Sequence, residues 1–82
     1  MKTIQVNGIN YNVHITETSS GFDYIELCDI NDSLVAIAYV DRNIEQMSVR
    51  FYEEEDVRTG SVDFFEFEGK YIELATWMAG CL

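Results

Sequence analysis

The sequence predicts an α+β domain: a twisted antiparallel sheet of four to five strands (β-β-β-β-β-α order), with one C-terminal amphipathic helix packed on one face. Three observations predict this class. Apolar and polar residues alternate through the first half of the chain, which is typical of strands. Clusters of turn-forming residues separate these runs. Beyond residue 60 the apolar spacing changes to that of a helix. With 82 residues, we expect a single domain, 1–82.

The first two strands are expected to form a hairpin around Asn-Gly at positions 7 and 8. Asn-Gly between two alternating runs predicts a type I′ turn, because both positions of this turn need a positive φ. A two-residue loop pairs Val6 with Ile9 and Ile4 with Tyr11. These four apolar side chains therefore share one face of the sheet.

Three further strands are expected, separated by turn residues at 19–21, 31–33 and 41–43. The third runs from Phe22 to Ile30. The fourth, from Leu34 to Val40, is apolar on both faces, which is typical of a central strand. The fifth, from Met47 to Tyr52, alternates and has one polar face.

The C-terminal segment is predicted to be one long helix. Asp63 and Glu66 have the spacing of a capping box, and Gly80 is a natural stop. A stripe of apolar residues from Phe64 to Met78 lies within an arc of about 100°. Alternatively, 62–67 is a strand, and Gly69 inside a helix costs about 1 kcal/mol. The single helix is favoured because the stripe continues in phase through Gly69. The expected core is Ile4, Val6, Tyr11, Val13, Leu27, Val35, Ile37, Val49, Phe51, Phe64, Phe67, Tyr71, Leu74 and Met78.

The charge limits the kinds of partner. Fifteen acidic residues against five Lys and Arg give a net charge of −10, which opposes direct binding to nucleic acid or to an anionic membrane surface. The longest apolar run, Leu34 to Val40, is too short to cross a bilayer. The first residues turn polar too early for a signal peptide, so we expect a cytoplasmic protein. The partner that this charge attracts is a basic protein.

The sequence carries no recognisable catalytic or metal-binding motif. His14 is the only imidazole and is interpreted as a solvated strand residue. One His and two distant cysteines, Cys28 and Cys81, make a poor zinc ligand set. The segment 29–33 fails as a calcium loop because its sixth and twelfth positions are Leu34 and Val40; it is interpreted as a turn. We therefore expect a non-enzymatic protein without a cofactor or a metal. A small hydrolase that uses carboxylates and His14 is a third hypothesis.

Acidic residues are candidates for partner binding. The run Glu53, Glu54, Glu55 and Asp56 is either a solvated loop or part of a negative surface that imitates nucleic-acid phosphates. In the second interpretation the surface also includes Glu45, Asp63, Glu66, Glu68 and Glu73.

Three apolar residues lie off the helix stripe: Phe65, Ile72 and Trp77. Either the rest of the chain covers them, or they anchor a partner or a homodimer contact, since aromatic residues dominate interface hot spots.

These features favour a small acidic binding protein that engages a basic, nucleic-acid-binding protein through its carboxylates. In size, acidity, absence of Pro and lack of a catalytic constellation, the chain is similar in general character to the anti-CRISPR and anti-restriction inhibitors made by phages and other mobile elements; no motif carries this likeness. The alternative is a self-associating protein–protein interaction module that uses the apolar residues off the helix stripe.

Overall fold

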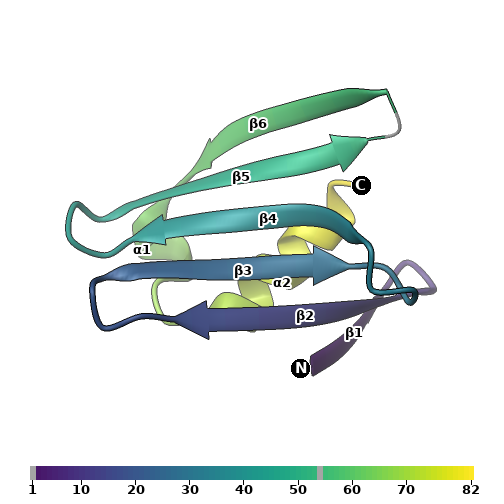
Figure 1. Cartoon of the computed structure of the whole chain (residues 1–82), viewed down its shortest axis with the longest axis horizontal. Helices are drawn as coiled ribbons and strands as arrows, with labels where there is room; N and C mark the ends of the chain where they lie inside the picture. Colours follow the sequence, from purple (N-terminus) through teal and green to yellow (C-terminus); the bar gives the residue numbers. More distant parts are fainter. Residues whose placement is uncertain (1, 54) are drawn as a thin grey trace.

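The computed structural model describes residues 2–53 and 55–82, which form a six-stranded antiparallel sheet and two helices (Figure 1). The strands pair in the order of the sequence. The elements are β1 (Lys2–Val6), β2 (Ile9–Glu17), β3 (Phe22–Cys28), β4 (Leu34–Asp41), β5 (Gln46–Glu53), β6 (Asp56–Val62), α1 (Phe64–Phe67) and α2 (Tyr71–Gly80). The α+β class and the C-terminal helix are confirmed, and the sheet has six strands instead of four to five.

Helix α2 lies across one face of the sheet and packs on β1, β2 and β3 (Figure 1). Neither of the two described helices covers the opposite face, called the open face below. The core lies between α2 and the sheet, where Leu74 and Met78 meet Ile25 and Leu27, all four fully buried. No helix among the described residues has the length and apolar character needed to cross a membrane.

The N-terminal hairpin has the predicted turn and register. The residues at positions 7 and 8 have φ of 53° and 78°, and Val6 pairs with Ile9 and Ile4 with Tyr11. Tyr11 is buried, and Ile4 and Val6 are partly buried against the core. Ile9 remains exposed because it lies at the tip of the hairpin.

In strand β4, the residues that face the core are not the ones that were predicted to do so. Ala36, Ala38 and Val40 are buried, whereas Val35 and Ile37, both predicted in the core, are half-buried on the alternate positions. The prediction fails here because a strand that is apolar on both faces does not reveal its phase.

The sixth strand, β6, is absent from the prediction, which places no strand or helix between the fifth strand and the C-terminal helix. All residues of β6 except the last are exposed, so no apolar alternation marks it. It forms as an edge strand through backbone pairing with β5. Arg58 contributes an anchor, since its guanidinium lies 4.7 Å from the centre of the Phe51 ring and donates to the Cys81 carbonyl.

The single long helix is wrong, and so is the alternative strand over 62–67. The chain forms two helices, α1 and α2, separated at Gly69, which has a φ of 70°. Asp63 caps α1 as predicted, because its side chain accepts a hydrogen bond from the Phe65 amide. The stripe nevertheless predicts burial correctly for Phe64, Phe67 and Leu74, since both helices turn it toward the core.

Replacing Gly69 with Ala is expected to lower the free energy of unfolding by about 1 to 2 kcal/mol, since an L residue is strained at positive φ. A Cβ at this position would meet no atom within 4 Å, so the backbone alone determines the effect. Gly80→Ala is the matched control: Gly80 is helical and equally open, so Ala should stabilise by up to about 1 kcal/mol. Urea unfolding measures both. Stabilisation by Gly69→Ala would contradict the break.

Candidate functional site

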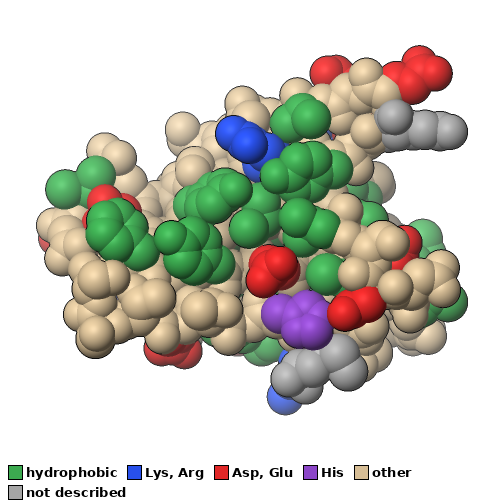
Figure 2. Space-filling model, viewed as in Figure 1, with side chains coloured by type: hydrophobic (Ala, Val, Ile, Leu, Met, Phe, Trp, Pro, Cys, Tyr) green, Lys and Arg blue, Asp and Glu red, His purple; other side chains and the backbone are tan. Residues whose placement is uncertain are grey.

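The open face of the sheet carries a band of apolar side chains. Tyr24 on β3 and Tyr39 on β4 are paired across the strands, and their rings meet edge to face at 5.8 Å. Figure 2 shows this band running diagonally across the face, with basic and acidic side chains on either side. It consists of Phe22, Tyr24, Ile37, Tyr39, Tyr52 and Val57. Unpartnered apolar surface of this kind is typical of an interaction site.

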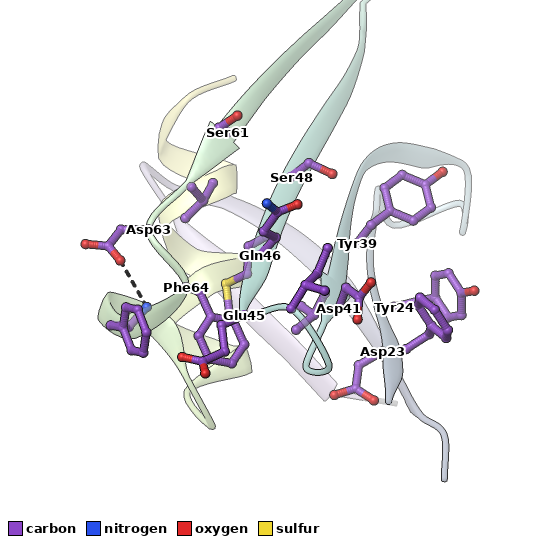
Figure 3. Close-up of a pocket in the computed structure, with 16 residues that line it drawn as sticks. Asp23, Tyr24, Tyr39, Asp41, Glu45, Gln46, Ser48, Ser61, Asp63 and Phe64 are labelled. Carbon is purple, nitrogen blue, oxygen red and sulfur yellow. Dashed lines mark hydrogen bonds between the residues drawn. The ribbon is translucent and has the colours of Figure 1, made fainter. Parts of the chain in front are cut away.

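One end of the band leads into a pocket of about 600 Å³. The pocket lies where the β4–β5 turn meets the end of β6 and the start of α1. Figure 3 shows Tyr24 and Tyr39 on one side, Asp63 and Phe64 on the other, and Glu45 between them. This volume lies within the range of ligand pockets, about 300 to 1,000 Å³.

Exposed apolar side chains surround the pocket. Phe65 is 68% exposed, and its ring meets the Phe64 ring edge to face at 5.4 Å. Ile44 in the β4–β5 turn and Phe22 at the start of β3 are also exposed. Exposed apolar side chains beside a pocket supply contact area to a ligand.

Four acidic residues line the same pocket: Asp23, Asp41, Glu45 and Asp63. The Asp23 carboxylate is buried in an ion pair, which leaves the other three to face a ligand. Asp41 accepts a hydrogen bond from the Asn43 amide and Asp63 from the Phe65 amide, which orients each carboxylate. None of the described residues lining the pocket is Lys, Arg or His. Aromatic rings beside unpaired negative charge are the environment that a guanidinium or ammonium group prefers.

A second, smaller pocket of about 410 Å³ lies beside Asp23, whose side chain is only 1% exposed. Asp23 accepts hydrogen bonds from Arg42 Nε at 2.9 Å, Arg42 Nη2 at 3.3 Å, the Thr18 amide at 3.2 Å and Tyr71 Oη at 2.5 Å. Burial alone would raise the pKa of Asp23, but these donors outweigh burial and hold it below its usual value. Burial and the bond to Asp23 raise the pKa of Tyr71. The cluster joins two turns to α2 and is structural.

His14 lies in a cluster that the sequence did not indicate. Its Nε2 is 2.8 Å from Asp32 Oδ1, and the Cys28 thiol lies within 4.8 Å of both groups. Burial, with the negative charges of Asp32, Glu26 and Asp29, raises the pKa of Cys28. A catalytic cysteine needs the opposite shift, so this group is no activated nucleophile. The turn that holds Asp32 confirms the interpretation of 29–33.

The structure distributes the predicted acidic residues over several elements. Glu53, Glu55 and Asp56 lie at the β5–β6 turn, at the opposite end of this hairpin from the pocket, and Glu54 lies outside the described residues. Glu53 pairs with Arg58 at 3.0 Å, and both side chains are about half exposed. Glu66 is exposed on α1 and Glu73 on α2.

The three apolar residues off the predicted stripe separate as well. Phe65 lines the pocket. Ile72 is partly buried against the core. Trp77 is 40% exposed, and its ring centre lies 6.0 Å from that of Phe67. Of this set, only Phe65 joins the acidic residues Glu45 and Asp63 in one site.

Sequence reasoning missed Tyr24, Tyr39, Asp41 and Ile44. In β4, Ala38 and Val40 face the core, so Tyr39 between them faces outward, and Tyr24 pairs with Tyr39 on the same face. The sequence alone did not show which side of β4 faces the core. No family model, curated protein or solved structure matches this chain. The chemistry of the pocket and of the open face is therefore the guide to its function.

Proposed function

We propose that this chain is a non-enzymatic binding protein that engages a basic, nucleic-acid-binding protein, in the manner of an inhibitor that occupies its partner's basic surface. The observation that carries the proposal is the pocket, which several aromatic rings line together with Asp41, Glu45 and Asp63; no Lys, Arg or His is among its described lining residues. The net charge of −10 supports it, because negative charge steers a basic protein toward the surface. The two free thiols fit a cytoplasmic protein.

An arginine side chain of the partner fits this pocket best. Its planar guanidinium can stack on the Tyr24 or Tyr39 ring and at the same time donate two hydrogen bonds to Asp41 or Glu45. The apolar band continues from the pocket across the open face and offers area for the residues around that arginine. The carboxylates therefore select the partner and the band supplies contact area.

Self-association is the second candidate function, favoured by the exposure of Phe65 and Trp77. Two copies of the chain, each with a net charge of −10, repel one another. Self-association therefore requires an interface that keeps the carboxylates of the two copies apart. Light scattering at micromolar concentration, in low and in high salt, tests it. A monomer under both conditions would exclude it.

The pocket is tested by titrating the isotope-labelled protein with the capped tripeptide acetyl-Gly-Arg-Gly-amide and following its amide NMR signals. We expect shifts at Tyr24, Tyr39, Glu45 and Phe65, because these residues line the pocket. The tripeptide with citrulline in place of arginine has nearly the same shape without the charge and should shift these signals far less. Raising the salt should weaken binding, since exposed charges are screened within about 8 Å at physiological ionic strength.

Two matched double variants identify the carboxylates involved. Asp41→Asn with Glu45→Gln removes two charges at the pocket, and Glu55→Gln with Asp56→Asn removes two at the far end of the hairpin. The first pair should weaken binding of the arginine tripeptide at least about tenfold, since the loss of even one hydrogen bond between charged groups costs about 1.5 to 3 kcal/mol. The second should change affinity less than about twofold. If both double variants lost affinity equally, the attraction would come from the overall charge, and the proposal of an arginine site in this pocket would be wrong.

A further inference from the structure

We infer that His14, Cys28 and Asp32 form a binding site for a divalent transition-metal ion, with zinc the best match. The cluster brings one imidazole nitrogen, one sulfur and one carboxylate oxygen within 4.8 Å of one another. This inference does not rest on the proposed function, because none of the three residues lines the arginine pocket.

Three elements that are distant in the sequence converge at this point. His14 lies on β2, and Cys28 ends β3 where the register with β4 shifts. Asp32 lies in the following turn with a φ of 63°. Asp29 holds that turn, since its Oδ1 accepts hydrogen bonds from the Asn31 and Ser33 amides at 2.9 and 3.0 Å. The turn therefore places the Asp32 carboxylate independently of any ion.

The donor set selects the class of metal. Zinc binds sulfur, imidazole nitrogen and carboxylate oxygen at about 2.0 to 2.3 Å, whereas calcium and magnesium take oxygen ligands. Tetrahedral geometry with these bonds needs donor atoms about 3.3 to 3.8 Å apart. His14 Nε2 and Asp32 Oδ1, now 2.8 Å apart, must separate slightly to admit an ion. Their side chains are 32% and 60% exposed and have the freedom to do so.

The surroundings favour a cation. Cys28 is buried, so it provides a fixed ligand, and Glu26 and Asp29, like Asp32, place negative charge near it. Figure 2 shows the imidazole on the open face with acidic side chains on both sides. Three protein ligands leave one of the four zinc positions for water or for a group from another molecule.

Cobalt(II) is the probe, because a cobalt–thiolate bond gives a charge-transfer absorption in the near ultraviolet. Titration of the reduced, metal-free protein should show one cobalt per chain, intense tetrahedral bands in the visible and displacement by zinc. Zinc should also raise the melting temperature, since an ion that binds only the folded state stabilises it.

Variants distinguish this site from adventitious binding. Cys28→Ser should abolish the charge-transfer band, and Cys81→Ser, which removes the other thiol, should leave it unchanged. His14→Ala and Asp32→Asn should each weaken cobalt at least about tenfold, as loss of a ligand does; Asn tolerates the positive φ of position 32. Because Cys28 is buried, His14→Ala serves as the decisive variant if Cys28→Ser unfolds. Absence of the band in the unmodified protein, or a band that follows Cys81, would overturn the inference.

Discussion

Replacing Asp23 with Ala is expected to lower the free energy of unfolding by about 2 to 3 kcal/mol, because hydrogen bonds to a buried charged group contribute in this range. The variant leaves the Thr18 amide, the Tyr71 hydroxyl and the Arg42 guanidinium without their shared acceptor. Arg42 recovers part of the loss by turning into water, since its side chain is 45% exposed. A domain of this size has a total stability of about 5 to 15 kcal/mol, so the change is large. Urea unfolding at pH 7 measures it.

The same carboxylate makes stability depend on pH. The pKa of Asp23 is lowered in the folded chain, whereas in the unfolded chain it is about 3.9. The unfolded state therefore takes up a proton first as the pH falls. The contribution is fully present above about pH 5 and is lost as the pH falls from about 4 through the folded pKa.

Asp23→Asn distinguishes the effect of the charge of this side chain from the effect of its size. The amide keeps the size of the side chain and does not titrate, so this variant should lose less stability between pH 5 and pH 3 than the unmodified protein. Tyr71→Phe, which removes one donor to Asp23, should show a smaller loss at pH 7 than Asp23→Ala. If all three variants unfold at the urea concentration of the unmodified protein, the cluster does not stabilise the fold.

Leu74→Ala is expected to destabilise the protein by about 2 to 5 kcal/mol, the range for a leucine removed from a packed core. Leu74 is fully buried between α2 and the sheet. A helix of ten residues is not stable by itself in water, so α2 depends on this packing. Thermal unfolding followed by circular dichroism should show a much lower midpoint.

Glu73→Ala is the matched control, since Glu73 precedes Leu74 on the same helix and is exposed. Its effect should stay within about 0.5 kcal/mol, as is usual for surface positions. A loss at Glu73 as large as that at Leu74 would mean that the helix packs by a different face.

Much of the sheet was predictable from local signals. The hairpin turn at positions 7 and 8 and the register of Ile4 with Tyr11 follow from turn chemistry and alternation together. Strand β6 was not predictable in this way, because an exposed edge strand is stabilised by its partner strand. Likewise, Gly69 satisfies a helical pattern and a helix break equally well, and tertiary packing of α1 and α2 decides between them.

The candidate sites depended still more on tertiary structure. To predict the pocket, one must know which face of β4 is buried, and the sequence does not show this because both faces are apolar. One must also know that the β4–β5 turn lies beside α1. His14, Cys28 and Asp32 are distant in the sequence, and the pairing of β2 with β3 and the register shift at Cys28 bring them together. The acidic run at 53–56 was visible in the sequence as charge, but the separation of Glu53, Glu55 and Asp56 from the pocket was not.

The order of elements along the chain has a consequence during protein synthesis. Each strand pairs with the strand made just before it, so the sheet can assemble stepwise as the ribosome adds residues. Helix α2 is translated after all six strands, and until then the apolar face around Ile25 and Leu27 has no cover. Until α2 packs on the sheet, this exposed apolar surface makes the unfinished fold prone to aggregation.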